Sequence, residues 1–452
     1  MERGNLKEEI KRVAEIFLEK TKNNEIAIIS HHDTDGITSA TIMIKSLRKI
    51  DRKFSLKIVK SLEEKFIYSI PKDKIILFLD LASGSIHHLI NSKLNLENVF
   101  IIDHHEIPEN FQIPDNLNII NPELEKTIGK QKISASGLTY LFCKEINSTN
   151  KKFAKLAILG MVGDYLEKEI DKLNNGILEE GELQKKRGLV IYPSTRPLNR
   201  VLEYSSYPYI PGVTGNVKGV LELLREVGIN PKNGKYPSII ELDNEKMSNI
   251  ITAIMLRNPK AKNQDIVGDI FLIKMFNKLE DVREMSAIIN ACSRLGNSET
   301  AIKFCMEIPK AKKDAESIYM KYKQHLISGL KFVEESEKIS GRGFIIINAR
   351  DKIKDTIIGT IASIISSSAL YEEGTIITTM ALDENKKKIK ISSRIAGRNG
   401  RNVREILSLI INKIGGEVGG HNNAAGCLIN QEKEQEFIDN LKKHLEIEVV
   451  KI

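Results

Sequence analysis

The chain has 452 residues, of which 41% are hydrophobic and 28% are charged. This composition is typical of a globular protein with two or three domains. No apolar run approaches the ~18 residues of a membrane span, and the N-terminal stretch resembles an amphipathic helix rather than a signal peptide, so we expect a cytoplasmic protein without a membrane partner. The four cysteines have no CxxC spacing, which argues against a zinc site or a disulfide framework.

The net charge of +8 is unevenly distributed. Residues 341–414 hold thirteen Lys or Arg and seven Asp or Glu, a surplus of six that accounts for most of the excess. Such a stretch is typical of contact with a phosphate backbone, although a solvated lysine-rich surface gives the same pattern.

Short apolar runs alternate with helical patterns over the first third of the chain, which predicts a parallel sheet covered by helices. We place this domain at residues 1–175. The predicted strands are residues 26–30, 54–60, 75–80, 99–103 and 117–120. The predicted helices are residues 38–49, 85–91, 134–145 and 152–162.

The remainder of the chain predicts three further parts. Residues 176–310 form a mainly helical insertion, with helical patterns at 275–294 and 298–307. Residues 311–337 form a long helix, interpreted as a connection between domains, although a helix of a separate bundle fits equally well. Residues 338–452 form a smaller α/β domain, with strands at 344–348, 375–381 and 388–393, helices at 355–368 and 402–413, and a glycine-rich segment at 415–426.

Carboxylates follow several of the apolar runs in the first domain. Because ligands bind at the carboxyl ends of parallel strands, we expect these side chains to meet. Each position also has an ordinary explanation as a surface turn, a helix cap or a lysine partner. The residues are Asp33 and Asp35 in HHDTDG, Asp80 after KIILFL, Asp103-His104-His105 after NVFII, and Asp164 in LAILGMVGDY.

This combination of side chains indicates a site for two metal ions. Carboxylates with imidazoles favour manganese, zinc or iron over magnesium. Two such cations can clamp the attacking and leaving oxygens of a phosphoester hydrolysis. Of the two histidines before Asp33, His31 shares its parity in an extended segment and is the better candidate ligand, but the choice between His31 and His32 stays open. His87-His88, which follows no strand-end aspartate, is interpreted as helix surface.

A second group of candidate residues lies in the C-terminal domain. The glycines of GGHNNAAG allow close backbone approach to a phosphate, although a glycine turn against a sheet fits as well. Arginines in the preceding ISSRIAGRNGR suit phosphate oxygens. The candidates are Ser393, Arg394, Arg398, Gly419, Gly420, His421 and Asn422.

These motifs resemble those of a known family. DTDG, the strand-end Asp80, DHH and the helical Asp164 are similar to the four motifs of the DHH phosphoesterases, and GGHNNAAG with SSR is similar to their DHHA1 domain. The chain most resembles the archaeal RecJ-like exonucleases, in which an insertion separates the two domains. The resemblance therefore implies a parallel-sheet DHH domain and a smaller α/β DHHA1 domain, joined by a long helix.

The resemblance also implies roles for individual residues. Asp33 and Asp80 would hold one divalent cation, and Asp35, Asp80, His104 and Asp164 the other, with Mn²⁺ favoured over Mg²⁺. His105 would contact the scissile phosphate, so that Asp80 and His105 are the expected catalytic residues. Arg394 and His421 would hold the nucleotide backbone.

The function expected from this resemblance is a metal-dependent exonuclease that degrades single-stranded DNA or RNA to mononucleotides in repair or replication. One alternative is a phosphodiesterase of short oligonucleotides or cyclic dinucleotides, which would use the same residues. Another is a replication or repair scaffold that contacts partner proteins through the insertion. The direction of digestion, the oligomeric state and the physiological metal stay open.

Overall fold

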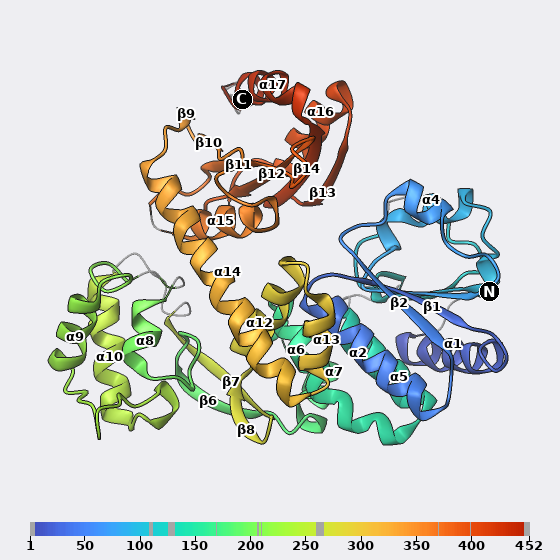
Figure 1. Cartoon of the computed structure of the whole chain (residues 1–452), viewed down its shortest axis with the longest axis horizontal. Helices are drawn as coiled ribbons and strands as arrows, with labels where there is room; N and C mark the ends of the chain where they lie inside the picture. The colour runs from blue at the N-terminus through green and yellow to red at the C-terminus, as the bar shows by residue number, and fades with distance from the viewer. Residues whose placement is uncertain are drawn as a thin grey trace. The chain divides into compact units, whose positions relative to one another are not determined.

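The computed structural model describes residues 5–107, 112–124, 132–168, 170–205, 208, 210–258, 266–368, 370–397 and 399–446. The chain divides into two compact units, one made of Met1–Arg187 with Asp269–Tyr319 and the other of Gly188–Gly268 with Met320–Ile452. Figure 1 labels the elements of both. No helix in the described part of the chain is long and apolar enough to cross a membrane.

A five-stranded parallel sheet, ordered β2-β1-β3-β4-β5, forms the centre of the first unit. Its strands are rich in isoleucine, whose branched side chains suit a sheet buried on both faces. The five strands lie close to their predicted positions: β1 Ile26–His31, β2 Phe54–Val59, β3 Ile75–Leu79, β4 Val99–Ile102 and β5 Asn118–Ile120.

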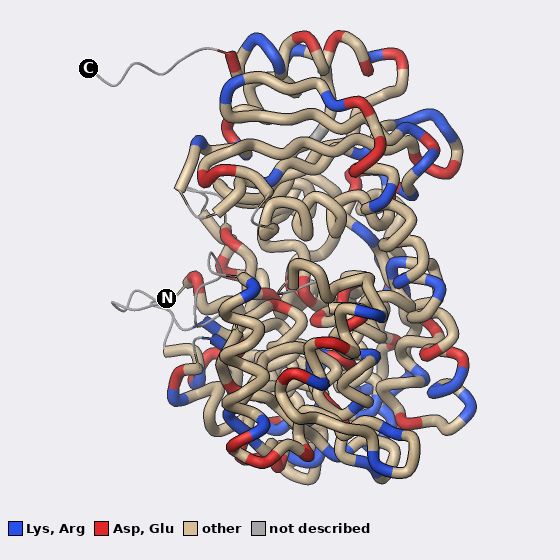
Figure 2. The backbone as a smooth tube through the Cα atoms, turned by 90° about the vertical axis from the view of Figure 1, so that its left-hand side faces the viewer, with Lys and Arg blue, Asp and Glu red and all other residues tan. Residues whose placement is uncertain are grey.

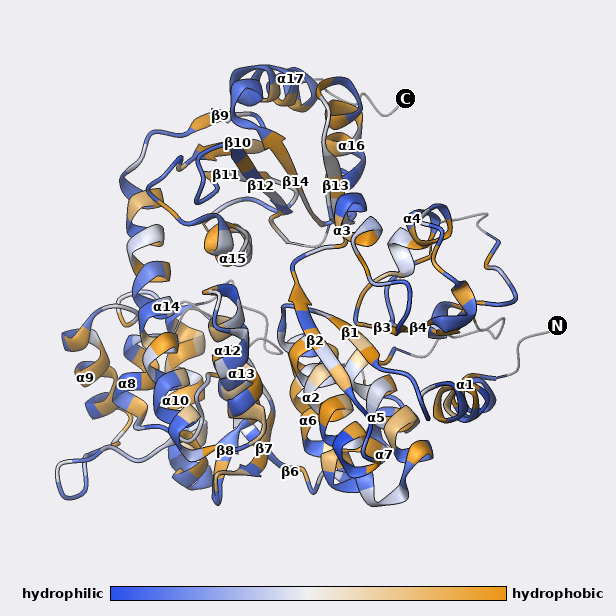
Figure 3. Ribbon diagram, turned by 45° about the vertical axis from the view of Figure 1, so that its right-hand side comes forward, coloured by the Kyte–Doolittle hydropathy of each residue, from blue (hydrophilic) through white to orange (hydrophobic). Residues whose placement is uncertain are grey.

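Helices cover both faces of this sheet. One face packs against α3 (Glu64–Tyr68) and α4 (Ile86–Asn91) through a single hydrophobic cluster. Behind the other face lie the helices whose hydrophobic residues are visible in Figure 3. They are α1 Leu6–Lys20, α2 Thr34–Lys49, α5 Ala135–Ile146 and α6 Ala154–Gly163, followed along the chain by α7 Lys172–Glu180.

The part of the insertion that returns to the first unit brings α12 (Val282–Arg294) against α2 and α6. The hydroxyl of Thr34 donates a buried hydrogen bond of 3.0 Å to the carbonyl of Ser286 on α12. Helix α13 (Ser298–Cys305) packs beside α12. The start of α2 is therefore held from the insertion side as well as from the sheet.

The sequence prediction of one helix over residues 275–294 is wrong at its beginning. The structure has a hairpin of β7 (Val267–Met275) and β8 (Lys278–Asp281), and the helix begins only at Val282. With β6 (Gln184–Leu189) these strands form a sheet ordered β6-β7-β8. The other described helices of the insertion are α8 Leu198–Glu203, α9 Val217–Glu226 and α10 Asn244–Arg257.

The long helix α14 (Pro309–Glu335) precedes the C-terminal α/β domain, as predicted. The sheet of this domain is mixed and has the order β13-β14-β12-β11-β10-β9. Helix α15 packs on one face, and α16 and α17 share a hydrophobic cluster with the other. The elements are β9 Ile339–Gly341, β10 Phe344–Asn348, α15 Asp355–Ser367, β11 Ile376–Leu382, β12 Lys388–Ile395, α16 Val403–Ile414, β13 Glu417–His421, β14 Ala424–Asn430 and α17 Glu434–Glu446.

The mixed α/β fold class, with a parallel-sheet domain, a mainly helical insertion and a smaller C-terminal α/β domain, is confirmed. The glycine-rich segment at 415–426 lies mostly in the edge hairpin β13–β14, whose alanines pair with β12 of the sheet. The domain boundaries at 175, 310 and 337 stay a prediction.

Phe17 on α1 ties three elements of the first unit together. Its ring is fully buried and meets Phe100 of β4 and Phe142 of α5 edge-on, at centroid distances of 5.1 and 5.4 Å. We expect Phe17→Ala to lower the free energy of unfolding by about 3–5 kcal/mol. Tyr68→Ala, at a side chain that is 50% exposed, is the control and should change it by less than about 0.5 kcal/mol. Equal effects in urea denaturation would contradict this assignment of the core.

Candidate metal centre

The carboxyl ends of β1, β3 and β4 deliver their side chains to one place beside the first turn of α2 and the end of α6. Within the described residues, three groups of side chains have ligand atoms close enough together to hold a metal ion. The groups are His31, Asp33 and Asp80; Asp35, His104 and Asp164; and Asp80, His104 and His105. The structure therefore brings together all the residues predicted as metal ligands, together with His105.

The first group forms around the end of β1. His31 Nδ1 lies 3.0 Å from Asp33 Oδ2 and 3.3 Å from Asp80 Oδ2. The other oxygen of Asp33, Oδ1, accepts a hydrogen bond from the Gly36 amide at the start of α2. His32 takes no part in the group, and its buried Nδ1 has no hydrogen-bond partner among the described residues. The geometry thus favours His31 over His32.

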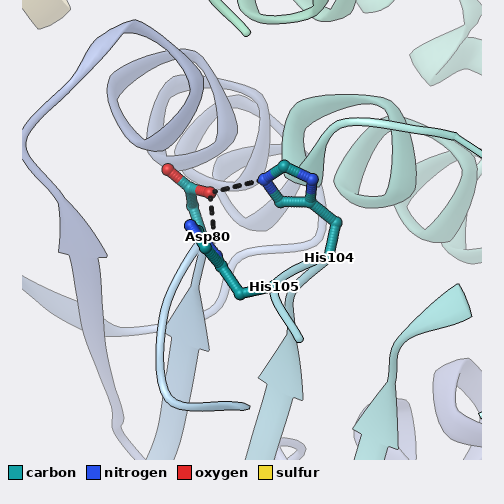
Figure 4. Close-up of side chains that lie close together, drawn as sticks. All are labelled: Asp80, His104 and His105. Atoms are coloured by element: carbon teal, nitrogen blue, oxygen red, sulfur yellow. Dashed lines mark ion pairs between the residues drawn. The ribbon is translucent and has the colours of Figure 1, made fainter. Parts of the chain in front are cut away.

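Asp80 links the groups. It follows β3 in a left-handed conformation with φ of 60°, and Ala82 has φ of 97°. Non-glycine residues at positive φ store strain, which is common at functional sites. Figure 4 shows Asp80, His104 and His105 pointing toward one another, with Asp80 Oδ1 3.5 Å from His104 Nε2 and 3.9 Å from His105 Nδ1.

Asp35 is held by the beginning of α5. Its two carboxylate oxygens accept hydrogen bonds of 2.7 and 3.0 Å from the amides of Ala135 and Ser136. Gly160 on α6 passes so close that a Cβ there would lie 2.3 Å from Asp35 Oδ1. The N-terminus of α5 thus binds a carboxylate of the chain, and the Ser134 hydroxyl caps the helix by accepting a hydrogen bond from the Gly137 amide.

His104 and Asp164 complete the second group. His104 Nε2 lies 3.2 Å from Asp164 Oδ2 and 3.9 Å from Asp35 Oδ2. Asp164 is the C-terminal cap residue of α6, so its side chain leaves the helix at the sheet edge. The ordinary interpretation of Asp164 as the partner of a lysine is not supported, because its neighbours are acidic residues and His104.

His105 is oriented by Asp103, whose role the sequence did not indicate. The buried Asp103 Oδ1 lies 2.7 Å from His105 Nδ1 and also accepts hydrogen bonds from the amides of His104 and His105. Its Oδ2 accepts from the Ser83 amide. With Nδ1 engaged, the 44% exposed side chain of His105 presents its Nε2 to a ligand, as expected of a histidine with a fixed partner.

Crowding of acidic groups shifts their proton affinities. Burial, with the charges of Asp33 and Asp35, raises the pKa of Asp80 to about 6. Burial and Asp35 raise the pKa of Asp164 well above its usual range. Burial lowers the pKa of His104, but contact with Asp80 and Asp164 outweighs it and holds the pKa well above the ordinary value.

The donor set fits divalent cations. Asp80 Oδ1 and Asp164 Oδ2 are buried and accept no hydrogen bond from any described residue. Buried carboxylate oxygens without donors cost several kcal/mol unless a cation compensates them. The mixture of carboxylates and imidazoles suits manganese better than a site lined only by oxygen.

The predicted substrate residues lie in the C-terminal domain. Residues 419–422 are exposed at the end of β13 and just after it. Arg394 on β12 donates to the Ser363 hydroxyl of α15 and to the carbonyls of Ser393 and Ala425. The Ser393 side chain is 1% exposed and shares a hydrogen bond with Thr378. Arg398 lies outside the described residues, and the substrate roles of this group stay predictions.

Three family profiles match the chain in order. The DHH family N-terminal domain matches residues 25–161, the DHH-CID domain residues 192–265, and the DHHA1 domain residues 342–446. The chain belongs to the DHH family. The first of these domains contains Asp33, Asp80 and the DHH triplet.

One relative of this DHH protein extends over nearly its whole length and another over about a third of it. The uncharacterized protein MJ0831 of Methanocaldococcus jannaschii is 28% identical over 443 residues, covering 95% of this chain and 96% of its own. YorK of Bacillus subtilis, which carries the provisional name single-strand DNA-specific exonuclease, is 25% identical over 167 residues, covering 34% of this chain and 28% of its own.

Solved structures share the fold. A manganese-bound exonuclease RecJ superposes with a TM-score of 0.59 at 15% identity, covering 97% of this chain and 95% of its own. CDC45 from Entamoeba histolytica superposes with a TM-score of 0.70 at 13% identity, covering 97% and 98%. At such low identities the superpositions show a shared fold only. The chemistry of the site is therefore inferred from the side chains of this chain.

If Asp80 is a ligand of two cations, its replacement must weaken the binding of both. We expect Asp80→Asn to bind Mn²⁺ at least about a hundredfold more weakly, since loss of an outer-shell partner alone costs 10–100-fold. Calorimetric titration of metal-free protein measures this. His88→Ala on α4 is the control and should bind Mn²⁺ as the wild type does. An unchanged affinity in Asp80→Asn would remove Asp80 from the site.

Protons should compete with the cations. Asp80 with a pKa of about 6 is mostly ionised at pH 7 and mostly protonated at pH 5, and a ligand carboxyl must lose its proton to bind. The ionised fraction of Asp80 falls about tenfold between pH 7 and pH 5. Mn²⁺ affinity should therefore fall by at least about tenfold over this range, a change of ~1.36 kcal/mol in the free energy of binding. A constant affinity over this range, from titrations at both pH values, would contradict the raised pKa.

Proposed function

We propose that this chain is a metal-dependent exonuclease that releases mononucleotides from single-stranded DNA or RNA. The observation that carries the proposal is that two groups of ligands adjoin, one of His31, Asp33 and Asp80 and the other of Asp35, His104 and Asp164. Asp80 Oδ1 lies 3.5 Å from His104 Nε2 and so links the two groups. We place one divalent cation, Mn²⁺ before Mg²⁺, in each group. When bound, such a pair would supply an ionised water at neutral pH and neutralise charge on the phosphodiester.

Each cation has its own set of ligands in this proposal. His31, Asp33 and Asp80 would hold one, and Asp80, Asp35, His104 and Asp164 would hold the other. Asp35 is fixed in place by the amides of α5, so its carboxylate needs no reorganisation to bind. Fixed ligands of this kind are what a preorganised catalytic site requires.

His105 would act on the substrate rather than on a cation. Burial lowers the pKa of His105, but contact with Asp103 outweighs it and raises the pKa above the ordinary value. Contact with Asp103 therefore favours the cationic form of the ring, and Asp103 holds it through Nδ1. Its Nε2–H would donate to a phosphate oxygen and position the scissile group against the attacking water.

The rest of the chain supports a polymer as the substrate. The C-terminal domain offers the exposed glycine-rich hairpin with His421, and residues 341–414 carry a surplus of six positive charges. Lysine and arginine track phosphates without reading sequence. The name of YorK and the fold shared with RecJ point the same way. A protein acting purely as a scaffold would have no need to keep every ligand of the two groups.

The decisive assay uses end-labelled single strands of DNA and RNA with Mn²⁺ or Mg²⁺. We expect a ladder that shortens to mononucleotides, and no product from Asp80→Ala or His104→Ala. Each loss should exceed about a thousandfold, because metal chemistry supplies several kcal/mol of the barrier and ~1.36 kcal/mol is a factor of ten. Melting curves and the variant His88→Ala control for folding.

Two outcomes would contradict the proposal. Full activity in either purified variant would refute the metal assignment. Activity confined to substrates of two to five nucleotides would favour a phosphodiesterase of short oligonucleotides instead.

A further inference from the structure

Three lysine ammonium groups gather around one buried phenylalanine ring at the far end of α2. The Nζ atoms of Lys45, Lys49 and Lys152 lie 5.1, 4.8 and 5.7 Å from the ring centroid of Phe153. Phe153 is 3% exposed, so the ring forms a fixed floor that holds the three charges close together. We refer to Lys45, Lys49 and Lys152 as the lysine cluster.

The cluster lacks an acidic partner. No ion pair joins any of its three lysines to a carboxylate within the described part of the chain. Lys49 donates only to neutral oxygens, at 3.0 Å to the Thr149 carbonyl and at 2.8 Å to the Asn150 side chain. The nearby Glu307 is taken by Lys155 and by the amide of Phe276.

Some other lysines of the chain do pair with carboxylates. Lys144 pairs with Glu180 at 2.6 Å, Lys303 with Glu299 at 2.6 Å, and Lys246 with Asp243 at 2.7 Å. Basic and acidic positions are interspersed along the backbone in Figure 2. The cluster differs from these pairs because three lysines converge on one ring, whereas Lys57 and Lys185 each lie singly over a phenylalanine.

The lysines also repel one another and their neighbours. Burial and the charge of Lys155 lower the pKa of Lys45, and burial and Lys152 lower the pKa of Lys49. The charge of Glu307 raises the pKa of Lys45 and so offsets this repulsion only in part. Clustered positive charge held at fixed positions attracts anions and is relieved by them. Lys49 and Lys152 are exposed and Lys45 is half-buried, so an anion can reach the cluster from solvent.

The cluster is separate from the metal centre. Helix α2 carries Asp35 in its first turn and Lys49 as its last residue. Fourteen residues of helix at ~1.5 Å each place Lys49 about 21 Å along the axis from Asp35. A single phosphate cannot contact both places, but a strand of about six stacked nucleotides, which rise ~3.4 Å each, can.

We propose that the lysine cluster is an accessory contact for the phosphate backbone of a single strand, away from the bond that is cleaved. The proposal rests on the proposed function, because it takes the polymer to be the ligand. Lysine point charges on flexible stems suit phosphates at any sequence. Long strands would gain affinity from the cluster, and strands too short to reach it would not.

The test compares Lys45→Gln/Lys152→Gln with Lys246→Gln/Lys303→Gln, which removes the same charge from paired lysines. Lys49 is left in place because its hydrogen bonds support the chain around Thr149. Anisotropy of labelled oligothymidylate of about 30 nucleotides, titrated with salt in metal-free buffer, measures log K against log salt. A tetranucleotide serves as the short ligand.

We expect the slope of log K against log salt for the long strand to become about 1.4 less steep in the cluster variant. Each of the two lost lysine contacts to a single-strand phosphate accounts for ~0.7 of this change. If affinities are equal at 1 M salt, this gives about 25-fold weaker binding at 0.1 M. The control variant should keep the wild-type slope.

In the cluster variant, tetranucleotide binding and its Mn²⁺-dependent hydrolysis should be unchanged. Lys45→Arg/Lys152→Arg should restore the slope, and Lys152→Gln alone, at an exposed position, should lose about half as much.

Several results would overturn the proposal. A wild-type slope in the cluster variant, with normal cleavage of the long strand, would refute the accessory contact and leave the proposed function standing. A wild-type chain that neither binds nor cleaves the strand sinks the proposed function together with it. Loss of binding to polyglutamate with an unchanged slope on the strand would assign the surface to an acidic protein partner instead.

Discussion

The buried carboxylate of Asp80 is the constraint around which the first unit is organised. One of its oxygens lacks a hydrogen-bond donor among the described residues, and its backbone occupies the strained left-handed region. Burying such a group without compensation costs several kcal/mol, and the backbone adds of order 1–3 kcal/mol. A fold that keeps a buried carboxylate at the end of a central strand requires positive charge nearby to offset this cost.

The histidines of the centre respond to this concentration of negative charge. Burial lowers the pKa values of His31 and His104, but their acidic neighbours outweigh it and hold both well above the ordinary value. A cation that binds these rings would therefore have to displace protons, which makes its affinity depend on pH.

Structure outside the ligand set fixes the ligands. The α5 amides hold Asp35, Asp103 holds His105, and α6 approaches Asp35 at Gly160, where a Cβ would also lie 2.1 Å from the Ser136 hydroxyl oxygen. The centre thus depends on segments more than a hundred residues apart. Substitution of these supporting residues should disturb the site without removing any ligand.

The amino-acid sequence predicted the parts of this site that depend on local pattern. Isoleucine-rich runs ending in aspartate located the parallel strands, and the parallel order of those strands brought their ends together. The anchoring of Asp35 by Ala135 and Ser136 was not predictable, because nothing in either segment identifies the other as its partner. The role of Asp103 was equally hidden, since a strand-end aspartate looks the same whether it binds a cation or a histidine.

The missed hairpins have a similar explanation. The turn between β7 and β8 places Phe276 and Asn277 at φ of 50° and 59°, where short hairpins usually carry Asn-Gly. The turn is supported by packing of Phe276 on Phe304, with ring centroids 5.2 Å apart. In β13 the repeated glycines removed the side-chain pattern by which strands are recognised.

Anomalous diffraction at the manganese edge, from crystals of the whole chain grown with Mn²⁺, tests the central claim most directly. The account predicts two peaks, both in contact with the Asp80 carboxylate, one beside Asp33 and the other beside His104 and Asp164. A single peak, or peaks that leave Asp80 without a cation, would contradict it.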